Sequence, residues 1–250
     1  MKQLSIVIPA YNEERRLRSS LESVVAFCRR ELDEWEVIVI DDGSRDRTGA
    51  IASEFPEVRC LRSATNRGKG QSVRRGMLEA RLDPVLFSDV DLSTPIEEAL
   101  DLLRAVGDGA DVAIGSRRRS AAKTVRRSRF RKLQAAVFRW LVKAIVLRGV
   151  HDTQCGFKAF RREAALAVFP VQRLEGWAFD VEVLFLARRL GYRVVEVPVR
   201  WEAAGESRLT RLSAFQMLRD LFRIRWYALT GRYGAASRAR EGAPARTGVD

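Results

Sequence analysis

The amino-acid sequence predicts an α/β fold with a mainly parallel central sheet. Short runs rich in β-branched residues alternate with longer segments of helical periodicity, as in chains whose strands are joined by helices. The chain has 250 residues, of which 46% are hydrophobic and 31% charged, enough for one main domain with a substantial core. Polar residues follow directly after several apolar runs, where open α/β sheets bind ligands.

The first half of the chain follows this alternation in order. We expect strands at residues 4–9, 36–40, 58–61, 85–88 and 112–115. Helices are expected between them, at residues 13–30, 46–54, 70–81 and 96–106. Regular alternation of this kind predicts a mainly parallel sheet.

A basic segment at residues 115–148 interrupts the alternation. It contains twelve lysine and arginine residues and no aspartate or glutamate, and so accounts for nearly all of the net charge of +13. Its second half, residues 130–147, has apolar residues at helical spacing with cations between them, which predicts an amphipathic helix lying on a membrane. A positive field of this size attracts anionic surfaces, nucleic acids and phosphorylated substrates.

Residues 154–200 return to alternating patterns of strand and helix, and the composition changes again after them. We expect a helix at residues 179–190, a strand at 193–197, and a second apolar stripe flanked by arginines at 212–230. Glycine, alanine, arginine and proline dominate the end of the chain, a composition typical of disorder. The predicted organisation is a main domain at residues 1–211, a C-terminal amphipathic helix at 212–232 and a disordered tail at 233–250.

Composition excludes several classes of protein. The three cysteines, Cys28, Cys60 and Cys155, are widely spaced and form no C-x-x-C pair, which argues against a disulfide framework and a zinc site and favours a reducing compartment. No run approaches the roughly 18 apolar residues of a spanning helix, and no signal peptide is visible. We therefore expect a soluble or peripheral protein without a transmembrane segment.

The ends of the first two predicted strands carry polar residues. Residues 9–14 read Pro-Ala-Tyr-Asn-Glu-Glu and residues 41–44 read Asp-Asp-Gly-Ser. Either stretch alone fits a helix-capping turn as well as a ligand contact, because asparagine, aspartate and serine are preferred N-caps. Together they indicate one pocket at the carboxyl ends of parallel strands.

A third strand end carries two carboxylates. The apolar run at residues 85–88 leads directly into Asp89, Val90 and Asp91. In an extended segment residues i and i+2 face the same side, so both carboxylates would meet one hard cation such as Mg²⁺ or Mn²⁺. A lone Asp-x-Asp also fits a solvated turn. The metal prediction therefore depends on the position of the pair in the series of polar motifs along the chain.

Eight motifs occur in order along the chain, at residues 7–14, 41–44, 66–70, 89–91, 152–158, 177–182, 196–201 and 205–209. Their order resembles that in family 2 glycosyltransferases, and the later motifs resemble the dolichyl- or polyprenyl-phosphate glucosyl- and mannosyltransferase branch. The resemblance covers about residues 3 to 232 and implies a GT-A nucleotide-diphospho-sugar transferase fold with amphipathic interfacial helices.

The resemblance implies a set of donor-binding residues. Those expected at the nucleoside are Pro9, Tyr11 and Glu13, with Asp41 or Asp42. Lys69 would orient the base or pyrophosphate, Asp89 would lie near the ribose and metal, and Asp91 would ligate the metal.

The acceptor side follows from the same resemblance. Gln154 would line the sugar and acceptor side, and Arg117 and Arg208 would bind phosphate groups. Asp180 lies where the superfamily commonly has its acidic base. A phosphate monoester has its second pKa near 6, so its attacking oxygen is already ionised at neutral pH and Asp180 positions more than it deprotonates.

The leading hypothesis is a metal-dependent, inverting hexosyltransferase bound peripherally at the cytoplasmic face of a membrane. It would use UDP-glucose as first choice, or GDP-mannose as second, and a polyprenyl phosphate as acceptor. An anionic membrane surface would attract the basic segment, with or without a recruiting membrane protein. One alternative keeps the fold but transfers to a soluble glycan or protein hydroxyl. A basic nucleic-acid-binding module is a third reading, but it leaves the acidic strand ends unexplained, so no nucleic acid partner is expected.

Overall fold

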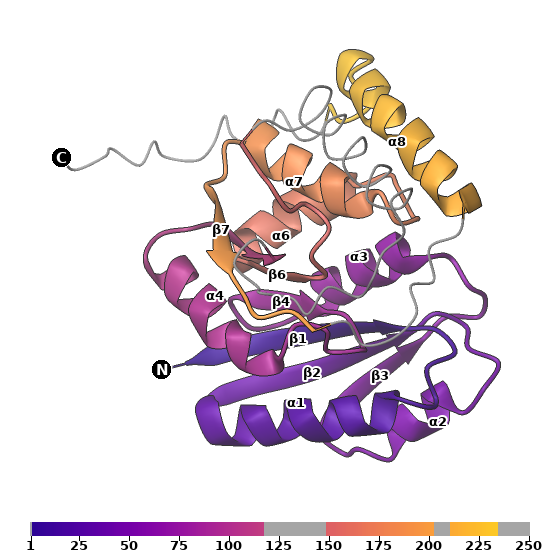
Figure 1. Cartoon of the computed structure of the whole chain (residues 1–250), viewed down its shortest axis with the longest axis vertical. Helices are drawn as coiled ribbons and strands as arrows, with labels where there is room; N and C mark the ends of the chain where they lie inside the picture. Colours follow the sequence, from indigo (N-terminus) through magenta and orange to yellow (C-terminus); the bar gives the residue numbers. More distant parts are fainter. Residues whose placement is uncertain (1, 118–148, 203–210, 235–250) are drawn as a thin grey trace.

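In the computed structural model, which describes residues 2–117, 149–202 and 211–234, one mixed sheet organises the chain (Figure 1). Within these ranges the sheet has seven strands in the order β3-β2-β1-β4-β6-β5-β7. All neighbouring pairs are parallel except those made by β6, which is antiparallel to β4 and β5. The strands are β1 (Gln3–Ala10), β2 (Glu34–Asp41), β3 (Val58–Arg62), β4 (Val85–Ser88), β5 (Val112–Ser116), β6 (Phe157–Phe160) and β7 (Val194–Pro198).

Helices cover both faces of the sheet and create two apolar cores. The first core joins the sheet to α3, α6, α7 and α8, and the second joins it to α1, α2 and α4. Alternate residues of β1 serve the two cores, since Val7 belongs to the first and Ile6 and Ile8 to the second. The helices are α1 (Leu17–Glu31), α2 (Thr48–Ser53), α3 (Lys69–Glu79), α4 (Ala99–Gly107), α6 (Arg162–Val168), α7 (Phe179–Arg189) and α8 (Arg211–Leu229), with short 3-10 turns η1 (Ile96–Glu98) and η4 (Phe169–Val171).

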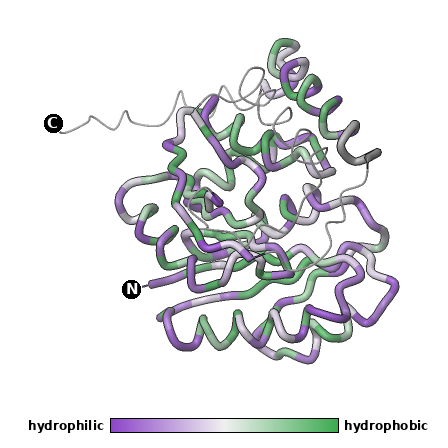
Figure 2. Tube along the Cα trace, viewed as in Figure 1, coloured by the Kyte–Doolittle hydropathy of each residue, from purple (hydrophilic) through white to green (hydrophobic). Residues whose placement is uncertain are grey.

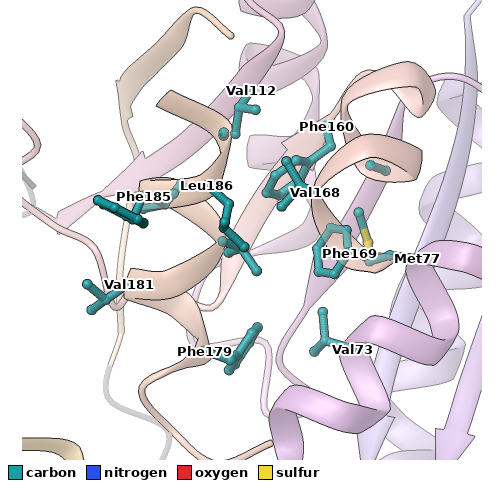
Figure 3. Packing of buried hydrophobic residues seen from close by; sticks show 14 of the residues in the cluster. Val73, Met77, Val112, Phe160, Val168, Phe169, Phe179, Val181, Phe185 and Leu186 are labelled. Atoms are coloured by element: carbon teal, nitrogen blue, oxygen red, sulfur yellow. The ribbon is translucent and has the colours of Figure 1, made fainter. Parts of the chain in front are cut away.

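The first core fixes α7 beneath the edge of the sheet that carries the polar strand ends. Figure 3 shows Phe179 of α7 beside Val73 of α3, with Phe160 and Phe169 packed further along. The ring of Phe179 lies 5.8 Å from that of Phe87, the penultimate residue of β4. Burial of such large aromatic side chains contributes about 2 kcal/mol each, so α7 is anchored close to the end of β4.

Register brings the predicted strand ends together. Ala10 at the end of β1 pairs with Asp41 at the end of β2, and Val7 pairs with Phe87 of β4. The residues that follow these three strands therefore emerge at one edge of the sheet. The prediction of an α/β fold with a mainly parallel sheet is confirmed.

Several expected elements differ in their details. The helix expected from residue 13 begins at Leu17, because the carbonyl of Glu13 accepts the N–H groups of Arg16 and Leu17 in a turn. The helix expected at residues 96–106 is divided into η1 and α4. The sequence patterns did not predict β6 or α6, which lie in the region expected only to alternate.

The C-terminal part also differs from expectation at its boundary. The helix expected at residues 212–232 is α8, from Arg211 to Leu229. Tyr233, where the tail was expected to start, is only 2% exposed and packs in the first core. Residues 235–250 and nearly all of the basic segment, including the amphipathic helix expected at 130–147, lie outside the described residues.

Helix α8 presents two contrasting faces. Figure 2 shows hydrophobic and hydrophilic residues alternating along it. Its inner face carries the buried Leu221 and Ile224, whereas Phe222, Trp226 and Leu229 are 55%, 59% and 77% exposed. Within the described ranges, no helix combines the length and the apolar character needed to cross a bilayer.

Candidate active site

The loops after β1 and β2 hold each other through side chains. The N–H of Asn12 donates to Oγ of Ser44 at 3.0 Å, and the N–H of Arg45 donates to Oδ1 of Asn12 at 2.9 Å. Asn12 adopts a positive φ of 52°, which asparagine tolerates better than most residues. Glu13 is buried, and its N–H donates to Thr48 at 2.8 Å. The loops after these two strands are therefore in direct contact, and Pro9 and Tyr11, at and just after the end of β1, are half-buried.

The two aspartates after β2 have different surroundings. Both oxygens of Asp42 accept backbone N–H groups, Oδ1 from Arg67 at 3.0 Å and Oδ2 from Gly68 at 2.8 Å. Asp41 is fully buried, and its Oδ1 accepts the N–H of Ser44 at 2.9 Å. Its Oδ2 has no hydrogen bond among the described residues and lies 3.4 Å from the guanidinium of Arg62. Asp42 thus holds the loop before α3, while Asp41 retains an acceptor oxygen.

Lys69 begins α3 and reaches the end of β4. Gly68 precedes it with φ of 98°, a conformation that favours glycine. The Lys69 ammonium lies 2.5 Å from Oδ1 of Asp89 and 5.3 Å from the ring centroid of Trp177. Burial lowers the pKa of Lys69, but the carboxylates of Asp89, Asp180 and Asp91 outweigh burial and raise it, so Lys69 is a cation at neutral pH.

The Asp89 and Asp91 pair sits in a turn rather than in an extended strand. Strand β4 ends at Ser88, and the N–H of Leu92 donates back to the carbonyl of Asp89 at 3.2 Å. Asp91 accepts the N–H of Ser93 at 3.0 Å. The prediction that Asp89 and Asp91 face the same side of an extended segment is therefore wrong, because the chain turns as soon as β4 ends.

Glycine leaves room beside Asp89. A Cβ atom on Gly156 would lie 2.0 Å from Oδ2 of Asp89, closer than any side chain allows. A small pocket opens at this place, lined by Ser88, Asp89, Ser93, Thr94, Gly156 and Trp201.

The donor set at this turn fits a hard cation only in part. Carboxylate oxygens are suitable ligands for Mg²⁺ or Mn²⁺. Within the described ranges, no group of three or more His, Cys, Asp and Glu side chains is arranged to hold a metal. Mg²⁺ usually binds through one or two carboxylates, with waters and substrate phosphates as further ligands. Asp89 and Asp91 are consistent with that substrate-completed type of site and not with a closed protein cage.

Beneath the pocket, a buried ion pair joins β6 to α7. The side chain of Lys158 is completely buried; its ammonium donates to Asp180 and, at 2.5 Å, to the carbonyl of Cys155. The same ammonium lies 5.1 Å from the ring centroid of Phe87. Burial raises the pKa of Asp180, and the positive charges of Lys158 and Lys69 oppose that effect. Asp180 is 4% exposed, so its carboxylate has little access to solvent, and it is already paired with Lys158.

Arg117 is also committed to a carboxylate. Its Nε and one terminal nitrogen each donate to Asp152 at 2.6 Å, and its backbone N–H donates to the same carboxylate at 3.0 Å. The guanidinium lies 5.7 Å from the ring of Trp201, which lines the pocket. Arg117 therefore borders the pocket with part of its guanidinium used by Asp152. Gln154 is half-buried in the following turn, and Arg208 lies outside the described residues.

Asp152 is in turn held by Glu196 of β7. Oε1 of Glu196 accepts the backbone N–H groups of His151 and Asp152 at 3.1 and 2.9 Å. Oε2 lies 2.8 Å from Nδ1 of His151. This arrangement connects the ion pair of Arg117 to the edge strand β7 and gives His151 a structural contact.

Known proteins resemble this chain over most of its length. Residues 5–169 match the protein family described as glycosyl transferase family 2. The chain belongs to glycosyl transferase family 2. Dolichyl-phosphate beta-glucosyltransferase of Drosophila melanogaster is 41% identical over 254 residues, covering 94% of this chain and 78% of that protein. The human protein of that name is 37% identical and covers 93% of this chain and 78% of its own length.

Solved structures agree with the fold of this family 2 glycosyltransferase. Glucosyl-3-phosphoglycerate synthase from Mycobacterium tuberculosis, in complex with phosphoglyceric acid, matches with a TM-score of 0.71 at 23% identity, over 89% of this chain and 80% of that one. The complex of that synthase with Mn²⁺, uridine diphosphate and phosphoglyceric acid gives a TM-score of 0.68 at 23% identity, over 93% and 79%. The predicted GT-A fold and the resemblance to the dolichyl-phosphate branch are confirmed.

Sequence reasoning assigned no role to Lys158 or Asp152, although both lie in a motif that it singled out. A signal for Lys158 was present, since it interrupts the apolar run Phe157 to Phe160. A lysine in a buried strand requires a partner, because an unpaired buried charge is costly. The identity of that partner depends on α7 lying under β6, which the sequence pattern does not specify.

Proposed function

We propose that this glycosyltransferase moves glucose from UDP-glucose to the phosphate of a dolichyl or other polyprenyl phosphate, with inversion at the anomeric carbon. The names of its relatives support the sugar and the acceptor. Crystal structures of the distant synthase with UDP-glucose and Mn²⁺ support the donor, and GDP-mannose is the second choice. The observation that carries the proposal is the buried pair of Lys158 and Asp180, because it favours an acceptor that needs no deprotonation.

The pair of Lys158 and Asp180 disfavours proton removal by Asp180 for an electrostatic reason. If Asp180 took a proton from a sugar hydroxyl, the ammonium of Lys158 would lose its counter-charge in a fully buried place. Leaving a buried charge unpaired costs about 3–5 kcal/mol, which would be added to the reaction barrier. A phosphate monoester with a second pKa near 6 already presents an ionised oxygen at neutral pH. Asp180 then keeps its partner and serves to orient the substrates.

On the donor side, the residues have separable roles. Asp41, with the half-buried Tyr11, borders the place where the nucleoside would bind, and Asp42 holds the loop that presents Lys69. Asp89 and Asp91 would hold a Mg²⁺ or Mn²⁺ ion, which would supply positive charge for the departing diphosphate. The ammonium of Lys69, beside Asp89, adds a second positive charge at the same place.

The transfer itself is a direct displacement. An oxygen of the acceptor phosphate forms a bond to the anomeric carbon of glucose while the bond from that carbon to the diphosphate oxygen breaks. The electron pair of the breaking bond leaves with UDP. Because the acceptor oxygen is already ionised, no proton needs to be removed from it. Alignment of the two substrates supplies most of the acceleration that the protein provides. Arg117, beside the pocket, is placed to attract the acceptor phosphate with the part of its guanidinium that Asp152 does not use.

The outer face of α8 supports a peripheral position at the cytoplasmic face of a membrane. Its exposed apolar residues, Phe222, Trp226 and Leu229, lie about one helical turn apart. Four arginines and one aspartate occur in Arg211–Leu229, so the helix is cationic. Apolar side chains beside cations suit the interface of an anionic bilayer.

The test is transfer of labelled glucose to a lipid phosphate. Purified full-length protein, vesicles containing dolichyl phosphate, and Mn²⁺ or Mg²⁺ should convert labelled UDP-glucose into an acid-labile glycolipid. Asp91→Asn should remove most of this activity, and chelation of the metal should do the same. A parallel reaction with GDP-mannose identifies the donor. No glycolipid with either donor would overturn the proposal.

The raised pKa of Asp180 favours a second candidate, in which the acceptor is the hydroxyl of a soluble glycan or protein. Asp180 would then be a general base. The double variant Lys158→Gln with Asp180→Asn separates the two functions, because it removes the base and leaves no unpaired charge. A phosphate acceptor predicts a fall in kcat of about tenfold or less, whereas loss of a base predicts a fall of about a hundredfold or more.

A further inference from the structure

A buried glutamate outside the catalytic arrangement links the end of the chain to the body of the protein. Glu182 of α7 is completely buried, and its Oε1 accepts the hydroxyl of Tyr233 at 2.6 Å. Its Oε2 accepts the backbone N–H of Leu174 at 2.8 Å, and both oxygens accept that of Arg173 at 3.1 Å. Since a buried carboxylate must be compensated by hydrogen bonds, Glu182 ties Tyr233 to the segment at residues 172–175.

That segment supports both sides of Lys69. The N–H of Gly70 donates to the carbonyl of Glu175 at 2.7 Å, and the side-chain amide of Gln172 donates to the carbonyl of Gly70 at 2.9 Å. A Cβ on Gly68 would lie 2.6 Å from the carbonyl oxygen of Glu175, so the two backbones touch. The position of Lys69, 2.5 Å from Asp89, therefore depends on where residues 172–175 lie.

The other end of the connection is α8. The ring of Tyr233 packs against Phe185 of α7 and Tyr227 of α8, with centroids 6.4 and 5.9 Å apart. The guanidinium of Arg173 donates twice to the carbonyl of Arg232, at 3.0 and 2.6 Å. These contacts place the turn after α8 directly on the segment that supports Lys69.

We propose that Tyr233 and Glu182 are positioning residues that couple binding of α8 to an anionic lipid surface with the placement of Lys69 for the nucleotide. The inference rests on the proposed function, since it takes the outer face of α8 as the membrane contact. When α8 is held by the lipid surface, the turn at Tyr233 is held with it, and Glu182 keeps residues 172–175 against Gly70. Lys69 then remains beside Asp89, where the diphosphate is bound. Because linkage is reciprocal, a lipid surface that favours this arrangement tightens nucleotide binding.

The test measures nucleotide binding with and without a lipid surface. Full-length protein is titrated with UDP and Mn²⁺ alone, with phosphatidylcholine vesicles, and with vesicles of phosphatidylcholine and phosphatidylserine. We expect the anionic vesicles to lower the Kd for UDP by about fivefold or more in the unchanged protein. Tyr233→Phe removes the hydroxyl and should abolish that change.

Tyr227→Phe is the matched control. It removes the hydroxyl of a neighbouring tyrosine, in α8, which accepts a hydrogen bond from Arg223 at 2.8 Å and, among the described residues, makes none to Glu182. It should keep the vesicle-dependent decrease in Kd. Hydrogen exchange gives an independent measure, because the amide of Gly70 should exchange about fivefold faster in Tyr233→Phe and remain unchanged in Tyr227→Phe.

The outcomes separate this inference from the function on which it rests. Equal tightening by anionic vesicles in Tyr233→Phe and the unchanged protein would overturn the coupling. The coupling would also be overturned if anionic vesicles did not alter the Kd for UDP in the protein without substitutions, even where labelled glycolipid is formed. Failure of the proposed function is recognised separately, by the absence of glycolipid product. In the transfer assay, the coupling predicts that Tyr233→Phe raises KM for the nucleotide-sugar more than it lowers kcat.

Discussion

The two sides of the sheet hold their charged side chains in different ways. In the β1–β3 region, residues 3–68, the carboxylate of Asp42 accepts backbone N–H groups from Arg67 and Gly68. In the β5–β7 region, residues 112–117 and 149–198, two buried carboxylates are paired with cationic side chains, while Glu182 and Glu196 accept backbone N–H groups. Asp180 is paired with Lys158, and Asp152 with Arg117.

This difference has an energetic consequence. A backbone N–H that loses its acceptor costs about 1–3 kcal/mol when buried, and the loop that carries it can adjust. A buried cation that loses its counter-charge has no such adjustment, and the cost rises to about 3–5 kcal/mol. We therefore expect removal of a buried counter-charge in the β5–β7 region to affect folding most, and changes at Asp42 in the β1–β3 region to act chiefly on donor binding.

The largest effect is expected for Lys158→Met, which leaves Asp180 buried without its cation. The free energy of unfolding should fall by about 3–5 kcal/mol, measured by urea denaturation. The double variant Lys158→Gln with Asp180→Asn should recover most of this loss, because a neutral pair keeps hydrogen-bonding groups and removes both charges. Equal losses in the single and double variants would contradict the ion-pair interpretation.

An intermediate effect is expected for Asp42→Asn. The amide retains one acceptor oxygen but turns an NH₂ group toward one of the two backbone donors, and this should cost about 2 kcal/mol. The KM for the nucleotide-sugar should rise more than kcat falls, since the loop before Lys69 is loosened. Asp33→Asn is the control, because Asp33 accepts the backbone N–H of Lys2 at an exposed position away from the site. A similar rise in KM in both variants would show that the effect does not come from the loop before Lys69.

The smallest effect, and the one that tests pH dependence, is expected for Arg117→Lys. Burial raises the pKa of Asp152, but the hydrogen bonds and charge of Arg117 outweigh it and hold that pKa below its usual value. A lowered pKa stabilises the folded state at pH above about 3.9, and this contribution is lost as the pH falls through the folded pKa. Lysine keeps the charge but loses the two-point geometry, so the variant should be about 1 kcal/mol less stable at pH 7.

The stability difference for Arg117→Lys should therefore narrow below about pH 4 and close once Asp152 is protonated. Urea denaturation at pH 7 and at lower pH measures it. Arg104→Lys is the matched control, since Arg104 pairs with Asp101 on the exposed face of α4. A difference for Arg117→Lys that stayed constant with pH would show that its origin is not the charge of Asp152.

Some of the predicted elements depend only on neighbouring residues in the sequence, whereas others depend on contacts between distant residues. Strands β1, β2, β4 and β5 lie within a few residues of their expected positions because their apolar runs are buried on both faces of the sheet. The polar ends of β1 and β2 meet as expected because the parallel register aligns Ala10 with Asp41. Strand β4 ends at Ser88 as expected, and the turn at Asp89 matches the solvated-turn alternative and not the extended segment assumed for the metal site.

The sequence by itself determined the fold class, the family and the position of the polar strand ends, because these depend on local periodicity and on ordered motifs. Only the tertiary structure decided what each charged side chain contacts. Lys158 and Asp180 are 22 residues apart, and Arg117 and Asp152 are 35 apart. Their pairing requires the antiparallel β6 to lie between β4 and β5 with α7 packed beneath it. Burial then makes each charge depend on its partner, and burial is a property of the packed sheet and helices.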